Sequence, residues 1–196
     1  RHARCRQDPA GGARTISRLT GRHAQAAGHH RAALALLREV GDREGEACAL
    51  DNLGLAYQQT GQLDRAAEHH RQALAISRDI GDRDDEARAL NNLGAICRRS
   101  GRYAQAEEHH QAALRLSGDL GDPGGQAKAL NGLGELARVT GDLAQALRAH
   151  ADAHQYASKI GLRQEQAREH WNRALAVYEA LGFPEAEAIR ARLAAR

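Results

Sequence analysis

The sequence predicts an all-α fold of stacked helix pairs, and three observations support this prediction. The same residue pattern returns every 40 positions, so that Gly41, Gly81 and Gly121 are equivalent. The apolar content of 42% comes mostly from Ala and Leu, which favour helices. The chain has only one Phe, one Trp and no Met to build a large central core. Because each layer of a solenoid contacts only its neighbours, a solenoid of antiparallel helix pairs needs no such core.

Each repeat reads as two helices bounded by glycines. One glycine ends the second helix and the aspartate after it caps the next helix, in the pairs Gly41-Asp42, Gly81-Asp82 and Gly121-Asp122. Pro123 stands at a first helical position, where its missing N–H costs nothing. A second set of glycines ends the first helix of each pair: Gly61, Gly101 and Gly141.

The repeats organise residues 1–196 as a single domain. Full repeats cover 41–80, 81–120 and 121–160, and 21–40 supplies the second helix of an earlier repeat. Residues 1–20 are expected to be a degenerate or partly disordered start, because Pro9 and the pair Gly11-Gly12 disfavour a helix. Residues 161–181 read as an atypical last repeat. Residues 183–196 read as a capping helix, with acidic residues early and arginines late, as the helix dipole favours.

The repeat motif resembles the tetratricopeptide repeat. In the first full repeat its positions hold Leu50, Leu53-Gly54, Tyr57, Ala66, His70 and Ala73. The usual period is about 34 residues, so the period of 40 implies longer helices. This longer form is similar to the arrays of kinesin light chains, of spindle-orientation adaptors and of actinobacterial multidomain regulators. The resemblance implies a right-handed superhelical solenoid of about four to five repeats plus a C-terminal capping helix.

Histidines recur along the repeats, as the pairs His29-His30, His69-His70 and His109-His110 and as His150 alone. Zinc needs three or four ligands that converge on one point, whereas adjacent helical residues point about 100° apart. His30, His70, His110 and His150 fall where the repeat normally packs an aromatic side chain. We therefore expect packed structural histidines, and predict no metal and no cofactor.

No recognised catalytic pattern is present in the sequence. There is no His-Glu-x-x-His motif and no glycine-rich phosphate loop after a strand. The acidic pairs Asp84-Asp85 and Glu107-Glu108 are expected on solvated helical surfaces. We therefore expect that this chain is not an enzyme.

The resemblance implies that the first helix of each repeat lines a concave groove. The candidate peptide-binding residues on these helices are Asn52, Arg88, Asn91, Asn92, Arg98, Lys128, Asn131 and Arg138. An Asn amide both donates and accepts hydrogen bonds, so a row of them can pair with an extended peptide backbone. Arg and Lys favour acidic side chains. The alternative is that the asparagines cap or bridge neighbouring helices.

These observations predict a protein–protein interaction module that binds an extended, acidic or amphipathic ligand, within a larger bacterial regulatory protein. A structural or homo-oligomerisation array without a peptide ligand is the alternative. Nucleic-acid binding is disfavoured, because aromatic residues that could stack on bases are scarce and the net charge is only +3.

The location of the protein is predicted from its cysteines and its hydropathy. Cys5, Cys48 and Cys97 have no disulfide spacing, and no apolar run approaches the ~18 residues of a membrane span. We expect a cytoplasmic protein without a membrane partner. Because the chain starts with Arg1 and contains no Met, we also expect a piece of a longer protein.

Overall fold

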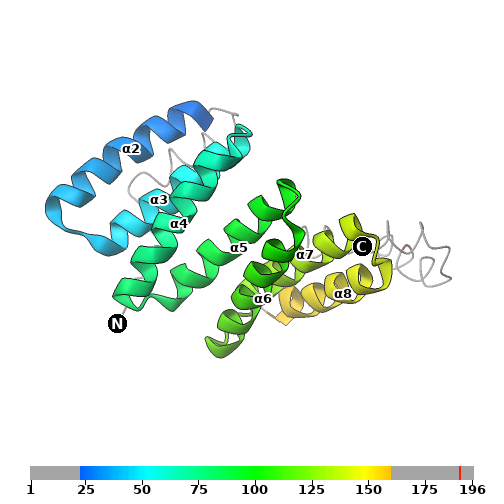
Figure 1. The fold of residues 1–196 in the computed structure, drawn as a ribbon. Coiled ribbons are helices and arrows are strands. Elements are labelled where there is room, and N and C mark those ends of the chain that lie inside the picture. Colours follow the sequence, from blue (N-terminus) through cyan, green and yellow to red (C-terminus); the bar gives the residue numbers. More distant parts are fainter. Residues whose placement is uncertain (1–22, 160–189, 191–196) are drawn as a thin grey trace. The chain divides into compact units, whose positions relative to one another are not determined.

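The structure, a computed structural model, describes residues 23–159 and Arg190. Over these residues it is entirely helical, which confirms the predicted fold class (Figure 1). The helices are α2 (His23–Val40), α3 (Arg43–Gln59), α4 (Leu63–Ile80), α5 (Arg83–Arg99), α6 (Tyr103–Asp119), α7 (Pro123–Thr140) and α8 (Leu143–Lys159). The degenerate start over 1–20, the atypical repeat over 161–181 and, Arg190 excepted, the capping helix over 183–196 lie outside the described residues.

The predicted turns and caps are confirmed. The six turn glycines, at 41, 61, 81, 101, 121 and 141, have φ between 63° and 89°, a conformation that favours glycine. Asp42 accepts a hydrogen bond from the Gly45 N–H at 2.9 Å. Asp82 accepts one from the Asp85 N–H at 2.9 Å, and Asp122 accepts from the two N–H groups at 124 and 125. Each second helix is thus followed by a glycine turn and a capped first helix.

The chain divides into two compact units, Arg1–Ile96 and Cys97–Arg196, here called unit 1 and unit 2. In unit 1, α3 packs against both α2 and α4. In unit 2, α7 packs against both α6 and α8. The first helix of a repeat therefore contacts a second helix on each side, as expected for stacked helix pairs.

Small side chains build the cores of both units. In unit 1 the large members of the core are Leu34, Leu50, Leu53 and Ile76, and alanines fill the rest. In unit 2, a core cluster contains Cys97, Ala106 and Leu136. Alanines that are almost fully buried allow the helices to approach each other closely. Within 23–159 no Phe, Tyr or Trp is among the buried core residues, although the partly buried Tyr57 packs against the core of unit 1.

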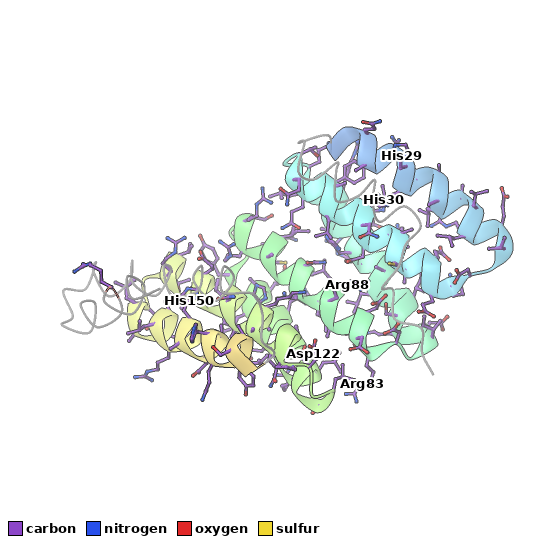
Figure 2. All side chains as sticks on the ribbon, turned by 180° about the vertical axis from the view of Figure 1, so that it is seen from behind. His29, His30, Arg83, Arg88, Asp122 and His150 are labelled. Carbon is purple, nitrogen blue, oxygen red and sulfur yellow. The ribbon has the colours of Figure 1, made fainter. Side chains whose placement is uncertain are left out.

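The repeated histidines are buried, as predicted. His70 is 0% exposed and His110 and His150 are each 1% exposed, while His30 is 7% exposed. His30 and His150, labelled in Figure 2, lie on the second helices α2 and α8. A Cβ added to Gly54 would lie 2.5 Å from Cε1 of the His70 ring. The glycine of the Leu-Gly motif therefore makes the space that the histidine ring occupies.

We predict that Gly54→Ala destabilises the protein by about 1–3 kcal/mol, because the added methyl group overpacks a buried ring that cannot move freely. Gly28→Ala is the control, since a Cβ at Gly28 meets nothing within 4 Å. This second change should stabilise α2 by roughly 0.5–1 kcal/mol. Urea denaturation of both variants measures the two effects, and equal stabilities would contradict the packing account.

Candidate functional site

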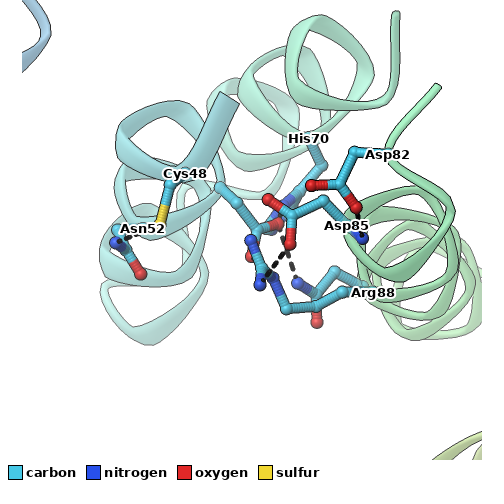
Figure 3. A network of polar contacts seen from close by, with 8 residues as sticks. Cys48, Asn52, His70, Asp82, Asp85 and Arg88 are labelled. Carbon is cyan, nitrogen blue, oxygen red and sulfur yellow. Dashed lines mark hydrogen bonds and ion pairs between the residues drawn. The ribbon is translucent and has the colours of Figure 1, made fainter. Parts of the chain in front are cut away.

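Three polar residues of unit 1, on α4 and α5, converge on the buried carboxylate of Asp51 on α3. Asp51 is only 2% exposed. Nδ1 of His70, on α4, lies 2.7 Å from its Oδ1, and Asn92 Nδ2, on α5, donates to the same oxygen at 2.9 Å. Arg88 Nε, also on α5, donates to Oδ2 at 3.0 Å (Figure 3). One carboxylate therefore joins α3, α4 and α5.

The charge state of Asp51 follows from these contacts. Burial by itself would raise the pKa of Asp51, but the hydrogen bond from His70 and the charge of Arg88 outweigh it and hold the pKa at about 2. An ionised carboxylate only accepts hydrogen bonds. Nδ1 of His70 therefore carries a proton and donates the hydrogen bond to Asp51.

Arg88 lies between two carboxylates. Its Nη1 is 2.7 Å from Asp85 Oδ1, while its Nε contacts Asp51. Burial opposes the charge of Arg88, yet the two aspartates together raise its pKa above the usual value. The prediction that Asp85 is solvated is wrong, because Asp85 is only 6% exposed and faces Arg88. That burial raises the pKa of Asp85.

The corresponding polar residues of unit 2 are arranged differently. Nδ1 of His150 lies 3.1 Å from Oδ1 of Asn131, so an amide stands where the pair of unit 1 has a carboxylate. Arg138 binds Glu135 through two nitrogens, at 3.0 and 3.3 Å. Burial would raise the pKa of Glu135, but Arg138 and the more distant charge of Arg98 lower it.

The eight candidate binding residues fall into three groups. Arg88 and Asn92 bind Asp51, and Asn52 is 8% exposed with its amide 3.8 Å from Cys48 Sγ. Half-buried residues form the second group: Asn91, Arg98 and Asn131. Lys128 and Arg138 are exposed. The internal bonds of Asn92 and Asn131 show that asparagines also bridge helices, as the sequence alternative held.

The central roles of Asp51 and Asp85 were not predicted from the sequence. One signal was available for Asp51: its equivalents at a spacing of 40 are Asn91 and Asn131, so it is the only acid of the three. It also precedes His70 by 19 residues, the spacing that separates Asn131 from His150. Asp85 carries no comparable signal, because it lies next to the exposed Asp84.

The described residues form neither a metal-binding cluster nor a membrane-spanning helix. Within 23–159, no three His, Cys, Asp or Glu side chains are grouped in a way that could hold a metal ion. None of the helices in that range is long and apolar enough to cross a bilayer.

Comparison with known proteins identifies the family. The family model of the tetratricopeptide repeat matches residues 15–79 and 82–160, so the chain belongs to the tetratricopeptide repeat family. A search of curated proteins found no match. The family assignment confirms the resemblance predicted from the Leu-Gly motif and its period.

Several solved structures are similar to the chain. BtubC (BKLC) from P. vanneervenii is 26% identical, with a TM-score of 0.78 over 92% of this chain and 75% of BtubC. Tetratricopeptide-like repeats from Podosopora anserina, assigned to a kinesin light chain, are 16% identical, with a TM-score of 0.70 over 94% of this chain and 91% of theirs. A Rap protein complexed with competence and sporulation factor is 17% identical, with a TM-score of 0.81 over 92% of this chain and 50% of the Rap protein.

The ion pair of Asp51 and Arg88 is predicted to be coupled by about 1–3 kcal/mol in a double-mutant cycle with Asp51→Asn and Arg88→Met. The amide in Asp51→Asn keeps an acceptor for His70, so the cycle reports mainly the lost charge. The control is the exposed pair of Glu68 and Arg71, whose coupling should stay below about 0.5 kcal/mol. Urea denaturation gives both values, and similar coupling in the two pairs would contradict the role of burial.

His110 is predicted to make the protein less stable in acid. Burial, the charge of Arg98 and then that of His109 lower the pKa of His110 from 6.5 to about 4. The unfolded chain therefore binds the proton more readily, so stability is full above pH ~6.5 and falls until pH ~4, by up to about 3 kcal/mol. Denaturation across this range should show a shallower loss for His110→Phe than for the wild type. The exposed control His29→Gln should retain the full loss.

Proposed function

We propose that the chain is a non-catalytic protein–protein interaction module that binds an extended peptide or a partner protein along its first helices. The observation that carries this proposal is the recurrence of polar residues at equivalent sequence positions of α3, α5 and α7. The family is built from interaction repeats, and one similar structure is a Rap protein complexed with competence and sporulation factor. A setting within a larger bacterial regulatory protein is part of the same proposal.

The hydrogen bonds of Arg88 and Asn92 to Asp51 support a binding role, because they hold these side chains in place before a ligand arrives. An Asn amide has two donors and two acceptor lone pairs, and the bond of Asn92 to Asp51 uses one donor. Fixing side chains in advance lowers the entropy lost on binding. We therefore assign Asn52, Arg88 and Asn92 to positioning, and the ligand contacts to Asn91, Arg98, Lys128, Asn131 and Arg138.

The proposal is tested by selecting peptides from a random display library with the whole chain and measuring their affinities by calorimetry. The double variant Asn91→Ala, Arg98→Ala should weaken the selected peptides by about tenfold or more, because it removes an amide and a charge from the ligand face. The matched control, Arg71→Ala with Gln111→Ala, changes exposed residues of the second helices α4 and α6 and should leave binding unchanged. Circular dichroism checks that each variant is folded.

Retained affinity in the folded double variant would contradict the assigned contacts. The exposed Arg138→Ala gives a second measurement that does not depend on the stability of the double variant. Failure to select any peptide would contradict peptide binding itself.

Self-association is the alternative function, and one feature of unit 1 favours it. Leu36 and Val40 on α2 are 62% and 76% exposed, and a spacing of four residues places them on one face of the helix. A second copy of the chain could cover this face. Sedimentation velocity over a concentration series separates the two functions: a concentration-dependent dimer abolished by Leu36→Glu supports self-association, and a constant monomer excludes it.

A further inference from the structure

The first helices of the two units differ in how their cations are balanced. Arg88 on α5 and Lys128 on α7 are equivalent residues, 40 positions apart. Arg88 in unit 1 contacts the carboxylates of Asp51 and Asp85, at 3.0 and 2.7 Å. Two negative charges thus surround one positive charge. The charge of Arg88 is therefore balanced by contacts within unit 1.

Lys128 has no aspartate at either of the two equivalent sequence positions. The residues at the same sequence offsets from Lys128 are Asn91 in place of Asp51 and Gly125 in place of Asp85. The other positions one turn away on α7 hold Gly124, Asn131 and Gly132, none of which is acidic. Lys128 is exposed and makes no hydrogen bond or ion pair with another residue of the described part of the chain.

The remaining charges on this side of α7 are also mostly positive. Lys128, Asn131, Glu135 and Arg138 follow at helical spacings of three and four, so they share one face of α7. Glu135 is bound by Arg138 and feels the charge of Arg98 from the last turn of α5. Three cations thus accompany one carboxylate, and that carboxylate is already engaged.

We propose that this α7 face, with Lys128 at one end and Arg138 at the other, is the subsite that recognises an acidic side chain of the ligand. Lys128 is its specificity-determining residue. The proposal rests on the proposed peptide-binding function and restricts it: the acid is read by unit 2, whereas the Asp51–Arg88 cluster of unit 1 does not select for charge. At a rise of 1.5 Å per residue the two ends are about 15 Å apart, enough for several residues of extended peptide.

The experiment uses peptides selected on the wild-type chain and compares each with versions in which single Glu or Asp residues become Gln or Asn. One acidic residue should account for a loss of about tenfold when it is neutralised, because a charge-assisted contact is lost. Lys128→Glu should give a similar loss for the acidic peptide and none for its neutral version. A peptide in which this acidic residue is replaced by Lys should bind the Lys128→Glu variant more tightly than it binds the wild type. Binding of the acidic peptide to the wild type should weaken as salt rises.

Two controls accompany Lys128→Glu. Arg115→Glu makes the same change of charge on α6, at an exposed residue of the same unit, and should leave all affinities unchanged. Arg71→Glu makes the same change of charge on α4 of unit 1, at another exposed residue, and should also leave all affinities unchanged. Because Lys128 is exposed, its variant is expected to fold, and circular dichroism checks this.

The outcomes distinguish this proposal from the function on which it rests. Selected peptides that are neutral or basic and insensitive to Lys128→Glu would leave peptide binding intact and overturn the acidic subsite. Equal losses with Lys128→Glu and Arg115→Glu would show a general effect of net charge, which also overturns it. Recovery of no peptide would refute the binding function and the subsite together.

Discussion

The arrangement of unit 1 depends on keeping the carboxylate of Asp51 ionised inside the protein. Removing an ion from water costs several kcal/mol unless hydrogen bonds and opposite charge compensate for it. His70, Arg88 and Asn92 supply that compensation from α4 and α5. These contacts are directional, whereas the alanine-rich packing around them is not. A shift of α4 or α5 against α3 would leave the carboxylate without a donor, so this single group fixes the register of three helices.

The same position in unit 2 shows what changes when the charge is absent. Asn131 contacts His150 at 3.1 Å, so the histidine keeps a polar neighbour without a buried carboxylate. A neutral amide carries no charge that a cation must compensate. The histidine and the glycine beneath its ring persist, because a Cβ at Gly134 would still lie 2.7 Å from the ring of His150. Packing is thus retained where the charge is lost.

The period of 40 residues allowed the helix ends, the glycine turns and the burial of the histidines to be predicted. Those features depend on local backbone geometry and on one repeated contact between helices. The residues responsible for both recur every 40 positions. The environment of the charges could not be predicted in this way. Arg88 and Asn92 meet Asp51 over 37 and 41 residues, and nothing in a single repeat shows whether a cation has an acidic partner in the repeat before it. Asp85 was misread for a different reason: its partner Arg88 lies only three residues on in the same helix, but such a spacing does not by itself show whether the pair is buried.

A repeat array can therefore separate stability from recognition by changing the partners of one position. A cation that is bound within the array, such as Arg88, stabilises the stack and has little attraction left for a ligand. A cation at the equivalent position that has lost its acidic partners, such as Lys128, costs little stability because it remains in water. Its interaction with an acidic ligand strengthens when binding excludes that water, and wrongly charged partners are repelled. The sequence positions that correspond to Asp51 and Asp85 hold Asn91 and Gly125 relative to Lys128, so the proposed subsite on α7 has a positive charge whose counterpart in unit 1 is balanced internally.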